Sequence, residues 1–382
     1  MEIGTARADP GEIARGYLEV AELPTAISEQ VPVVIARGEH DGPTLWVTAT
    51  QHSGEVTGLA VTLDVVSEDL ASDLRGTVVC LPALNPSGLR RTNLTEEGRH
   101  SYRTSYYDND NPNGYFPSAS EREADEDGEN GGDDGEGTST DKPGISSRPR
   151  VQELICRRIF EYIEDSADAL IDIHTAQAGW MPFSILGRVP YGTHRSEEDA
   201  RDLLDEQRRL ADAFGVPVTR GIGLEALGPE GNRSISGASR DVLEIPAFVA
   251  ELGGHSFVEE EYRKAGVVGL RNVMREMGML PGDLEPNDAA PDSPVDFEVQ
   301  HTPNPHTDTP GIARYHVDAG DVVQEGDPVC DIVSPNGGFR TTIESAHNGY
   351  IIGRYEGIAR YRNDALCCTA IRDESDVVGR VD

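Results

Sequence analysis

The sequence predicts an α/β protein whose mixed or parallel sheet is flanked by helices, followed by a small all-β domain. Over residues 30–280, short apolar runs that end in Gly, Pro or polar residues alternate with amphipathic runs of helical length. This alternation is typical of βαβ units. From residue 297 onward, short apolar runs are separated only by turns rich in Gly, Asn and Asp, which is the pattern of an all-β domain. A chain of 382 residues is long enough for both.

The first elements predict a parallel strand pair. Pro32–Ile35 and Thr44–Thr50 read as strands around a turn at His40–Pro43, and an apolar helix follows. Gly76–Leu81 is the next apolar strand, stopped by Pro82. Because strand, helix and strand come in that order, we expect the last two strands to run parallel.

The alternation continues through the rest of the first domain. The expected helices are Val151–Asp165, Asp199–Phe214 and Tyr262–Gly278, and the expected buried strands are Ala169–Ile173 and Ile245–Glu251. Residues 118–141 are rich in Glu, Asp, Gly and Ser and lack the apolar surface needed for folding, so we expect a disordered loop. We therefore predict a first domain over residues 1–280, an acidic, Pro-rich linker over 281–296 and a β domain over 297–382.

The charge of the chain is strongly negative. Asp and Glu number 68 against 33 Lys and Arg, which gives a net charge of -35. Such a charge repels nucleic acid and anionic lipid, so we expect neither as a partner. Lys occurs only at Lys142 and Lys264. This acid-rich, Lys-poor composition favours a halophilic protein, and an acidic mesophilic protein with one acidic loop is the alternative.

The sequence also gives an expectation about the cellular compartment of the protein. The five cysteines include no C-x-x-C pair, which fits a reducing environment. Met1–Pro10 has no apolar signal-peptide core, and no uncharged apolar run reaches the ~20 residues of a membrane span. We expect a soluble cytoplasmic protein and leave open whether it forms a homo-oligomer.

Polar residues that could bind a metal or transfer protons follow three separate predicted strands. These residues are His52 with Glu55, His174, and Glu251. Because ligand sites in open α/β sheets lie at the carboxyl ends of strands, we expect the residues to converge. Two His and one Glu leave the fourth position of a tetrahedral zinc ion for water, and a further carboxylate such as Glu251 can move the proton. The prediction is one zinc ion per chain.

Each motif taken alone has a purely structural explanation. His52 and Glu55 could cap a helix and offset its dipole. Asp172 and His174 could be a packed pair at a strand end, and Glu251 could be a turn residue. Their joint occurrence after three apolar strands is what favours a metal site.

The same residues resemble the succinylglutamate desuccinylase/aspartoacylase family. Thr50–Gly58 (TQHSGEVTG) is similar to the family signature H-G-D/N-E-x-x-G, Ile171–Ala176 (IDIHTA) to I-D-L-H-T, and Val249–Gly254 (VAELGG) to V-E-L-G-G. The resemblance covers roughly residues 30–280 and, more weakly, the C-terminal domain. It implies a zinc-carboxypeptidase-like fold and hydrolysis of an amide bond in a small N-acyl amino acid. His52, Glu55 and His174 would then be zinc ligands, and Glu251 the general acid/base.

The substrate-binding segment of the family, D-L-N-R-x-F-P, is matched only in part. Asn113 and Phe116-Pro117 agree with it, but Gly114 stands where the family has Arg. The resemblance implies that Asn113 and an arginine bind the substrate carboxylate. The candidates are Arg103 and Arg91, with Arg90 also open, and ordinary surface charge is the alternative for each. His255 could reach the site, but a solvated or packed role is favoured for this lone His.

The C-terminal domain resembles a lipoyl or biotinyl carrier domain at Val317–Val329 and Ser345–Ile352. A carrier requires a Lys at its hairpin tip, and residues 297–382 contain none, so we exclude an acyl carrier. The domain either borders the active site or simply caps the first domain. Two other functions stay open for the whole chain: a carboxypeptidase acting on short peptides, and a catalytically silent binding protein on the same fold.

Overall fold

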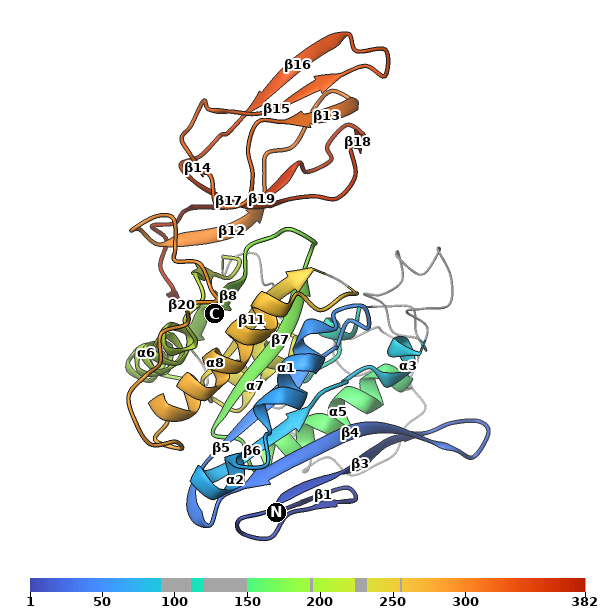
Figure 1. The fold of residues 1–382 in the computed structure, drawn as a ribbon, viewed down its shortest axis with the longest axis vertical. Coiled ribbons are helices and arrows are strands. Elements are labelled where there is room, and N and C mark those ends of the chain that lie inside the picture. The colour runs from blue at the N-terminus through green and yellow to red at the C-terminus, as the bar shows by residue number, and fades with distance from the viewer. Residues whose placement is uncertain are drawn as a thin grey trace, which may run out of the picture. The chain divides into compact units, whose positions relative to one another are not determined.

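The computed structural model describes residues 1–90, 107, 111–119, 150–192, 195–223, 232–254 and 256–381 (Figure 1). The chain divides into two compact units. The first contains residues 1–54, 68–172 and 224–247, and the second contains residues 55–67, 173–223 and 248–382. The predicted 118–141 loop lies outside the described residues except for Ser118 and Ala119. The predicted domain boundaries near residues 280 and 297 stay a prediction.

The first unit is built on five neighbouring strands in the order β7-β5-β6-β4-β3. Their bounds are β3 (Ile13–Glu22), β4 (Ser28–Arg37), β5 (His40–Ala49), β6 (Arg75–Leu81) and β7 (Ala169–Ala176), the last of which continues into the second unit. Strands β5 and β6 pair in parallel and are joined through α1 (Thr57–Val65), as predicted. The predicted turn at His40–Pro43 is wrong, because His40 already pairs with Arg75 in the ladder.

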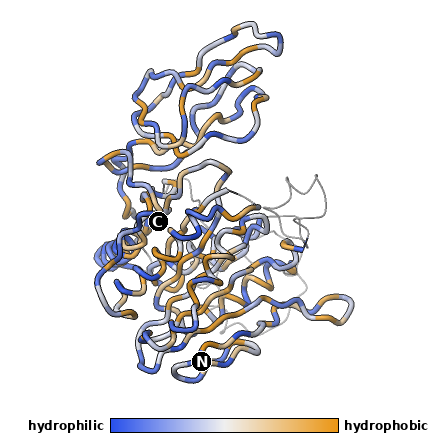
Figure 2. Tube along the Cα trace, viewed as in Figure 1, coloured by the Kyte–Doolittle hydropathy of each residue, from blue (hydrophilic) through white to orange (hydrophobic). Residues whose placement is uncertain are grey.

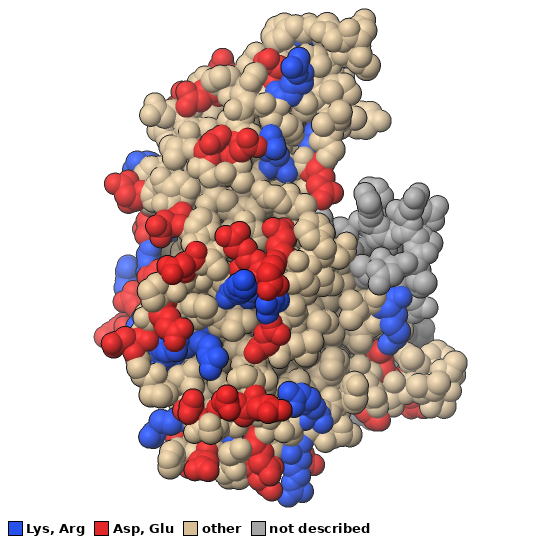
Figure 3. All heavy atoms as spheres, in the orientation of Figure 1, with Lys and Arg blue, Asp and Glu red and all other residues tan. Residues whose placement is uncertain are grey.

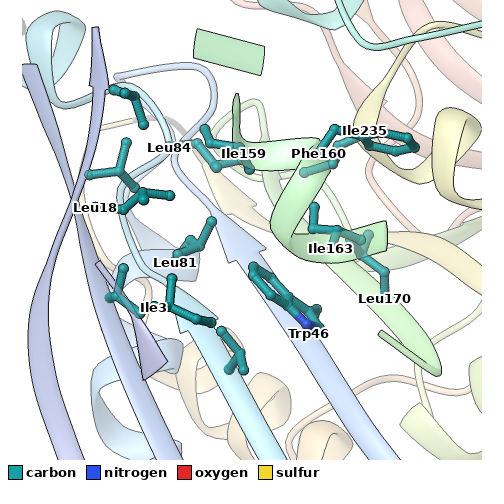
Figure 4. Close-up of a cluster of buried hydrophobic side chains, with 14 of the residues drawn as sticks. Ile3, Leu18, Trp46, Leu81, Leu84, Ile159, Phe160, Ile163, Leu170 and Ile235 are labelled. Carbon is teal, nitrogen blue, oxygen red and sulfur yellow. The ribbon is translucent and has the colours of Figure 1, made fainter. Parts of the chain in front are cut away.

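The core of the first unit lies between these strands and helix α5 (Val151–Glu164) (Figure 4). Ile155, Ile159 and Ile163 recur every four residues, so they share one face of the helix and are buried. Trp46 of β5 and Leu81 of β6 belong to the same cluster. The remaining elements of this unit are short: β1 (Glu2–Ile3), β2 (Ala6–Arg7), α2 (Leu70–Asp73), α3 (Pro86–Leu89), η2 (Pro112–Gly114) and α7 (Ile235–Val242).

In the described part of the second unit, helix α8 (Glu260–Glu276) packs closely against two other helices. They are α1 and α6 (Glu197–Phe214). A side chain at Gly266 would collide with Leu252 and Val61, and one at Gly269 would collide with Phe214, so these glycines permit the close approach. Helix α6 is largely hydrophilic along its length (Figure 2), as expected for a helix with an exposed face.

The strands of the second unit form the run β14-β17-β19-β12-β10-β8-β11. Their bounds are β8 (Phe183–Leu186), β10 (Val218–Arg220), β11 (Ala247–Gly254), β12 (Val299–Pro303), β14 (Val322–Val323), β17 (Gly349–Arg354) and β19 (Cys367–Arg372). A two-stranded sheet pairs β9 (Val189–Tyr191) with β20 (Val378–Arg380). Beside them, Arg188 donates to the carboxylate of Asp373, at 2.8 Å, and anchors the end of the chain.

All regular elements assigned within residues 299–381 are strands. Four of them, β13 (Gly311–Tyr315), β15 (Pro328–Val333), β16 (Phe339–Glu344) and β18 (Ala359–Arg360), form a separate antiparallel sheet. The turns predicted between the apolar runs of this region include those at 318–321 and 336–338, where Gly320 and Gly337 have positive φ angles of 91° and 87°. The likeness of this region to a lipoyl or biotinyl carrier domain stays a prediction.

Acidic side chains are spread over the face shown in Figure 3 and are not gathered in one patch. Arginines lie among the acidic side chains, and several form ion pairs with them, such as Arg201 with Glu197. Within the described residues, no helix combines the length and apolarity that crossing a bilayer requires.

Candidate metal centre

Three parallel strands bring the predicted site residues to one edge. Thr44 N–H donates to the Asp168 carboxylate at 2.7 Å, and Thr48 donates to that of Asp172, also at 2.7 Å. Thr48 follows Thr44 by four residues, and Asp172 follows Asp168 by four, so the contacts advance along both chains together and β5 and β7 run in the same direction. The backbone N–H of Leu170 donates to the carbonyl of Pro246, and Gly254 lies against Ala178, so β11 also runs parallel to β7. Their carboxyl ends therefore meet at one edge, as predicted.

The loop after β5 is held in a strained conformation. Thr50 has a φ angle of 57°, which is costly for a β-branched residue. Asn85 secures the loop, because its backbone N–H donates to the Thr50 carbonyl and its side chain donates to the Gln51 carbonyl, at 3.2 Å in each case. His52 and Glu55, which follow these anchored residues, are both buried.

The side chains of His52, Glu55 and His174 lie together and are buried. One potential ligand atom from each lies within 4.8 Å of those of the other two. The exposed fractions are 3% for His52, 1% for Glu55 and 5% for His174. Nδ1 of His174 lies 2.8 Å from Oε2 of Glu55, and the backbone N–H of Thr175 donates to the same oxygen at 3.2 Å.

This donor set fits a metal ion. A buried carboxylate and two imidazoles are the ligands that a catalytic zinc site uses. Within the described part of the chain, several polar atoms next to these residues are buried and have no hydrogen-bond partner: Thr50 Oγ1, both amide atoms of Gln51, and Thr175 Oγ1. Because buried polar atoms are rarely left unsatisfied, their number beside the cluster is typical of a site that holds an ion or water.

Asp172, two residues before His174, has a structural role. Its carboxylate accepts the hydrogen bond from Thr48 and so ties β7 to β5. For Asp172, this agrees with the alternative in which Asp172 and His174 are both packed structural residues. His174, however, points to Glu55. The two residues of the motif therefore serve different purposes.

Glu251 lies within β11 rather than at its end. The predicted strand end was wrong by three residues, because Leu252 is fully buried and β11 continues to Gly254. The strand alternates, so Ala250 and Leu252 are buried while Glu251 is partly exposed and stands opposite Phe183 of β8. The register with β7 sets Glu251 close to the level of His174 along the strands.

The C-terminal strands approach Glu251. The pKa of the Cys368 thiol in β19 is raised, first by its burial and then by the charge of Glu251. Cys368 pairs with Pro303 of β12, and Phe183 contacts the ring of His301 on the same strand with 5.7 Å between centroids. The surroundings of Glu251 on this side are therefore largely apolar.

The structure describes only some of the residues that were predicted to bind the substrate. Arg91, Arg103 and His255 lie outside the described residues. Arg90, left open as a further candidate, donates to both carboxylate oxygens of the buried Glu29, at 3.2 and 2.7 Å. Because its guanidinium group forms this bidentate ion pair, Arg90 has a structural role and is not a good candidate for binding the substrate.

Asn113 is described, and its side-chain oxygen is buried without a hydrogen-bond partner among the described residues. Phe116, in the same segment, is 1% exposed and packs against Phe160, with ring centroids 6.4 Å apart. Gly114 is exposed, and a Cβ placed there would meet no atom of the described residues within 4 Å. The described residues therefore leave room for a side chain at position 114.

Sequence reasoning missed one neighbour of the cluster. Oδ1 of Asn111 lies 3.1 Å from Nε2 of His52. The signal for it was the Asn-Pro pair at 111–112, which favours a turn; no pattern in the sequence connects that turn with His52.

Fold and site together define a mixed α/β protein with a buried His–Glu–His group suited to a catalytic metal. Solved structures with the same fold include a succinylglutamate desuccinylase from Silicibacter sp. TM1040, with a TM-score of 0.64, 19% identity, and coverage of 98% of this chain and 100% of that one. The ectoine utilization protein EutE (DoeB) from Ruegeria pomeroyi has a TM-score of 0.66 at 17% identity, with coverage of 97% and 100%. A succinylglutamate desuccinylase/aspartoacylase from Rhodobacter sphaeroides also reaches 0.66 at 17%, with coverage of 94% and 96%.

In sequence, the chain is similar to N-alpha-acetyl-L-2,4-diaminobutyric acid deacetylase from Halomonas elongata. The two are 25% identical over 313 residues, which are 79% of this chain and 73% of the relative. No protein-family model matches the chain. The resemblance to the succinylglutamate desuccinylase/aspartoacylase family is confirmed: the chain has the fold of this family. The Halomonas elongata relative is named as a deacetylase, and the structure from Silicibacter sp. TM1040 is named as a desuccinylase.

Proposed function

We propose that this protein is a zinc-dependent deacylase that hydrolyses the amide bond of a small N-acyl amino acid or a related acyl amide. The observation that carries the proposal is the buried group of His52, Glu55 and His174 at the carboxyl edge of parallel strands. The name of the similar Halomonas elongata protein, a deacetylase of an acetylated amino acid, supports the reaction class.

In this proposal His52, Glu55 and His174 hold one zinc ion per chain. When bound, zinc polarises the scissile carbonyl and lowers the pKa of a water molecule. The protein supplies the anionic ligand through Glu55, whose position is fixed by the backbone N–H of Thr175. A hydrogen bond to the ligand residue from the backbone restricts its geometry, as such bonds typically do at metal sites.

Glu251 is the proposed general acid/base. Its carboxylate would accept the proton of the attacking water and deliver it to the leaving amine. It is partly exposed on a strand whose neighbouring residues are buried, so it can meet a substrate while its backbone stays fixed. The apolar surroundings at Phe183 and Cys368 limit the access of other water to this proton transfer.

Substrate binding is assigned by the proposal to Asn113 and to Arg103 or Arg91. The oxygen of Asn113, which is buried and has no hydrogen-bond partner among the described residues, would accept a hydrogen bond from the amide N–H of a substrate. Gly114 removes one cation from the family's substrate-binding segment. Because one arginine rather than two would then face the substrate, we expect a weaker preference for substrates with a free carboxylate.

The test is a hydrolysis screen with the zinc-loaded protein in high salt. The substrates are acetyl and succinyl derivatives of diaminobutyrate, aspartate and glutamate, and short peptides are included for comparison. Glu251→Gln should keep its zinc and lose ~10²–10⁴-fold in rate, whereas the control Glu261→Gln, on an exposed position of α8, should match the wild type.

Three outcomes would count against the proposal. Turnover of peptides alone favours the carboxypeptidase alternative. Tight binding of acyl amino acids without turnover favours a silent binding protein. Full activity of Glu251→Gln removes this residue from the proton transfer.

A further inference from the structure

Asn111 lies at the start of the short helix η2 and is held in one orientation. Its side-chain oxygen accepts a hydrogen bond from the backbone N–H of Asn113 at 3.1 Å. Pro112, between them, has a restricted φ angle and helps to fix this turn. The position of the Asn111 amide is therefore determined by its own segment and does not depend on His52.

This turn also identifies which atom of Asn111 faces His52. A backbone N–H can only donate, so the side-chain atom that it meets is the amide oxygen and not the nitrogen. Nε2 of His52 lies 3.1 Å from the same oxygen. Because a carbonyl oxygen has no proton to give, Nε2 must be the donor in this pair.

The tautomer of His52 follows from this geometry. A neutral imidazole carries one proton, and with that proton on Nε2 the lone pair is on Nδ1. Metal ions bind the unprotonated nitrogen, and the hydrogen bond made by the other nitrogen decides which one is free. His52 is 3% exposed, so water has little access to compete for either position.

We infer that Asn111 is a positioning residue of the metal site: it holds His52 as the Nε2–H tautomer and so presents Nδ1 as the ligand atom. This inference rests on the proposed function, since it takes His52 to be a ligand. Asn111 does not touch the metal or the substrate in this assignment. Its effect is to prevent the ring from flipping and from sharing its proton between the two nitrogens.

The experiment measures the zinc dissociation constant of the full chain by competition with a chelator. Asn111→Ala should weaken zinc binding by ~10–100-fold, the usual cost of losing a partner that orients a ligand. Asn111→Asp retains an acceptor at the same place and should stay close to the wild type. Asn336→Ala is the matched control, because Asn336 makes the same side-chain bond to the backbone N–H two residues on, at 3.2 Å, in an exposed turn.

The histidine tautomer gives a readout that does not depend on metal. In nitrogen-15 NMR spectra of the zinc-free protein, His52 should be protonated at Nε2, and Asn111→Ala should give a mixture of tautomers. Protonation of Nδ1 in the wild type would overturn the inference, and this result needs no variant to fold.

His52→Ala separates the inference from the proposed function. If His52→Ala loses zinc but Asn111→Ala binds as tightly as the wild type, Asn111 has no positioning role while the metal site stands. If His52→Ala itself binds zinc normally, His52 is not a ligand and the proposed site fails, together with the role of Asn111.

Discussion

A single methyl group at Gly254 should displace the strand that carries Glu251. A Cβ at this position would lie 2.3 Å from the Cα atom and 2.5 Å from the backbone nitrogen of Ala178. Carbon atoms in ordinary contact are ~3.5 Å apart, so Gly254→Ala requires a movement of about 1.2 Å. Both obstructing atoms belong to the backbone, so no rotation of a side chain can relieve the contact.

This movement should reduce both stability and activity. Overpacking of this kind costs ~1–3 kcal/mol in the free energy of unfolding. Glu251 lies three residues before Gly254 on β11, and Ala178 lies four after His174. The displacement therefore changes the spacing between the proposed base and the metal ligand, where an error of ~1 Å can cost ~10²-fold in rate.

The assay is kcat/KM on the best acyl amino acid together with the thermal unfolding midpoint. Gly221→Ala is the matched control, because a Cβ at Gly221, which follows β10, meets its nearest neighbour at an ordinary 3.5 Å. Equal activity and stability in Gly254→Ala and Gly221→Ala would refute the reasoning that the two parallel strands meet tightly at the site.

Three further predictions concern other parts of the molecule. Glu29→Gln should cost roughly 1–3 kcal/mol at neutral pH, since the buried carboxylate loses its pairing with Arg90. Burial alone would raise the pKa of Glu29, but hydrogen bonds from Arg90 and Tyr107 outweigh it and hold the pKa below 4.5. The difference in free energy of unfolding between the wild type and Glu29→Gln should therefore be complete above pH 4.5 and shrink as the pH falls. A difference at about pH 3 that equals the one at neutral pH contradicts this. Gly114→Arg, where the described residues leave room for a side chain, should lower KM several-fold for substrates with a free carboxylate and leave uncharged amides unaffected; equal effects on both would refute it. With a net charge of -35, the melting temperature should rise as salt shortens the Debye length from ~10 Å at 0.1 M to ~3 Å at 1 M, and a flat profile contradicts the halophilic hypothesis.

Most helices and core strands could be predicted from the sequence because their apolar residues recur with a clear period. The end of helix α6 is an example, since Gly215 terminates it with a φ angle of 79°, whereas the helix begins just after its capping residue Ser196, two residues before the predicted Asp199. The parallel relation of β5 and β6 also followed from element order. Strand ends were less predictable, because pairing with a neighbour can extend a strand through residues such as Leu252 and Gly253-Gly254 that resemble a turn.

The candidate ligands could be predicted because they lie at or just after the carboxyl ends of apolar strands, and parallel strands end at one edge. His52 and Glu55 follow β5, whereas His174 lies within β7, which continues three residues beyond the predicted end at Ile173. The residues around the candidate ligands could not be predicted. Nothing in the sequence indicates that Arg90 is paired with Glu29, which lies 61 residues earlier, or that Asn111 faces His52 across 59 residues. Such contacts depend on how loops fold back over the edge, which hydrophobic periodicity does not encode.

The metal content of the purified protein tests the central claim most directly. The wild type should contain one zinc ion per chain, and His52→Ala and His174→Ala should each lose most of it. His347→Ala, which removes an exposed histidine from a turn of the C-terminal region, should retain the full amount. Zinc content that stays at the wild-type level in both His52→Ala and His174→Ala would contradict the proposed metal site.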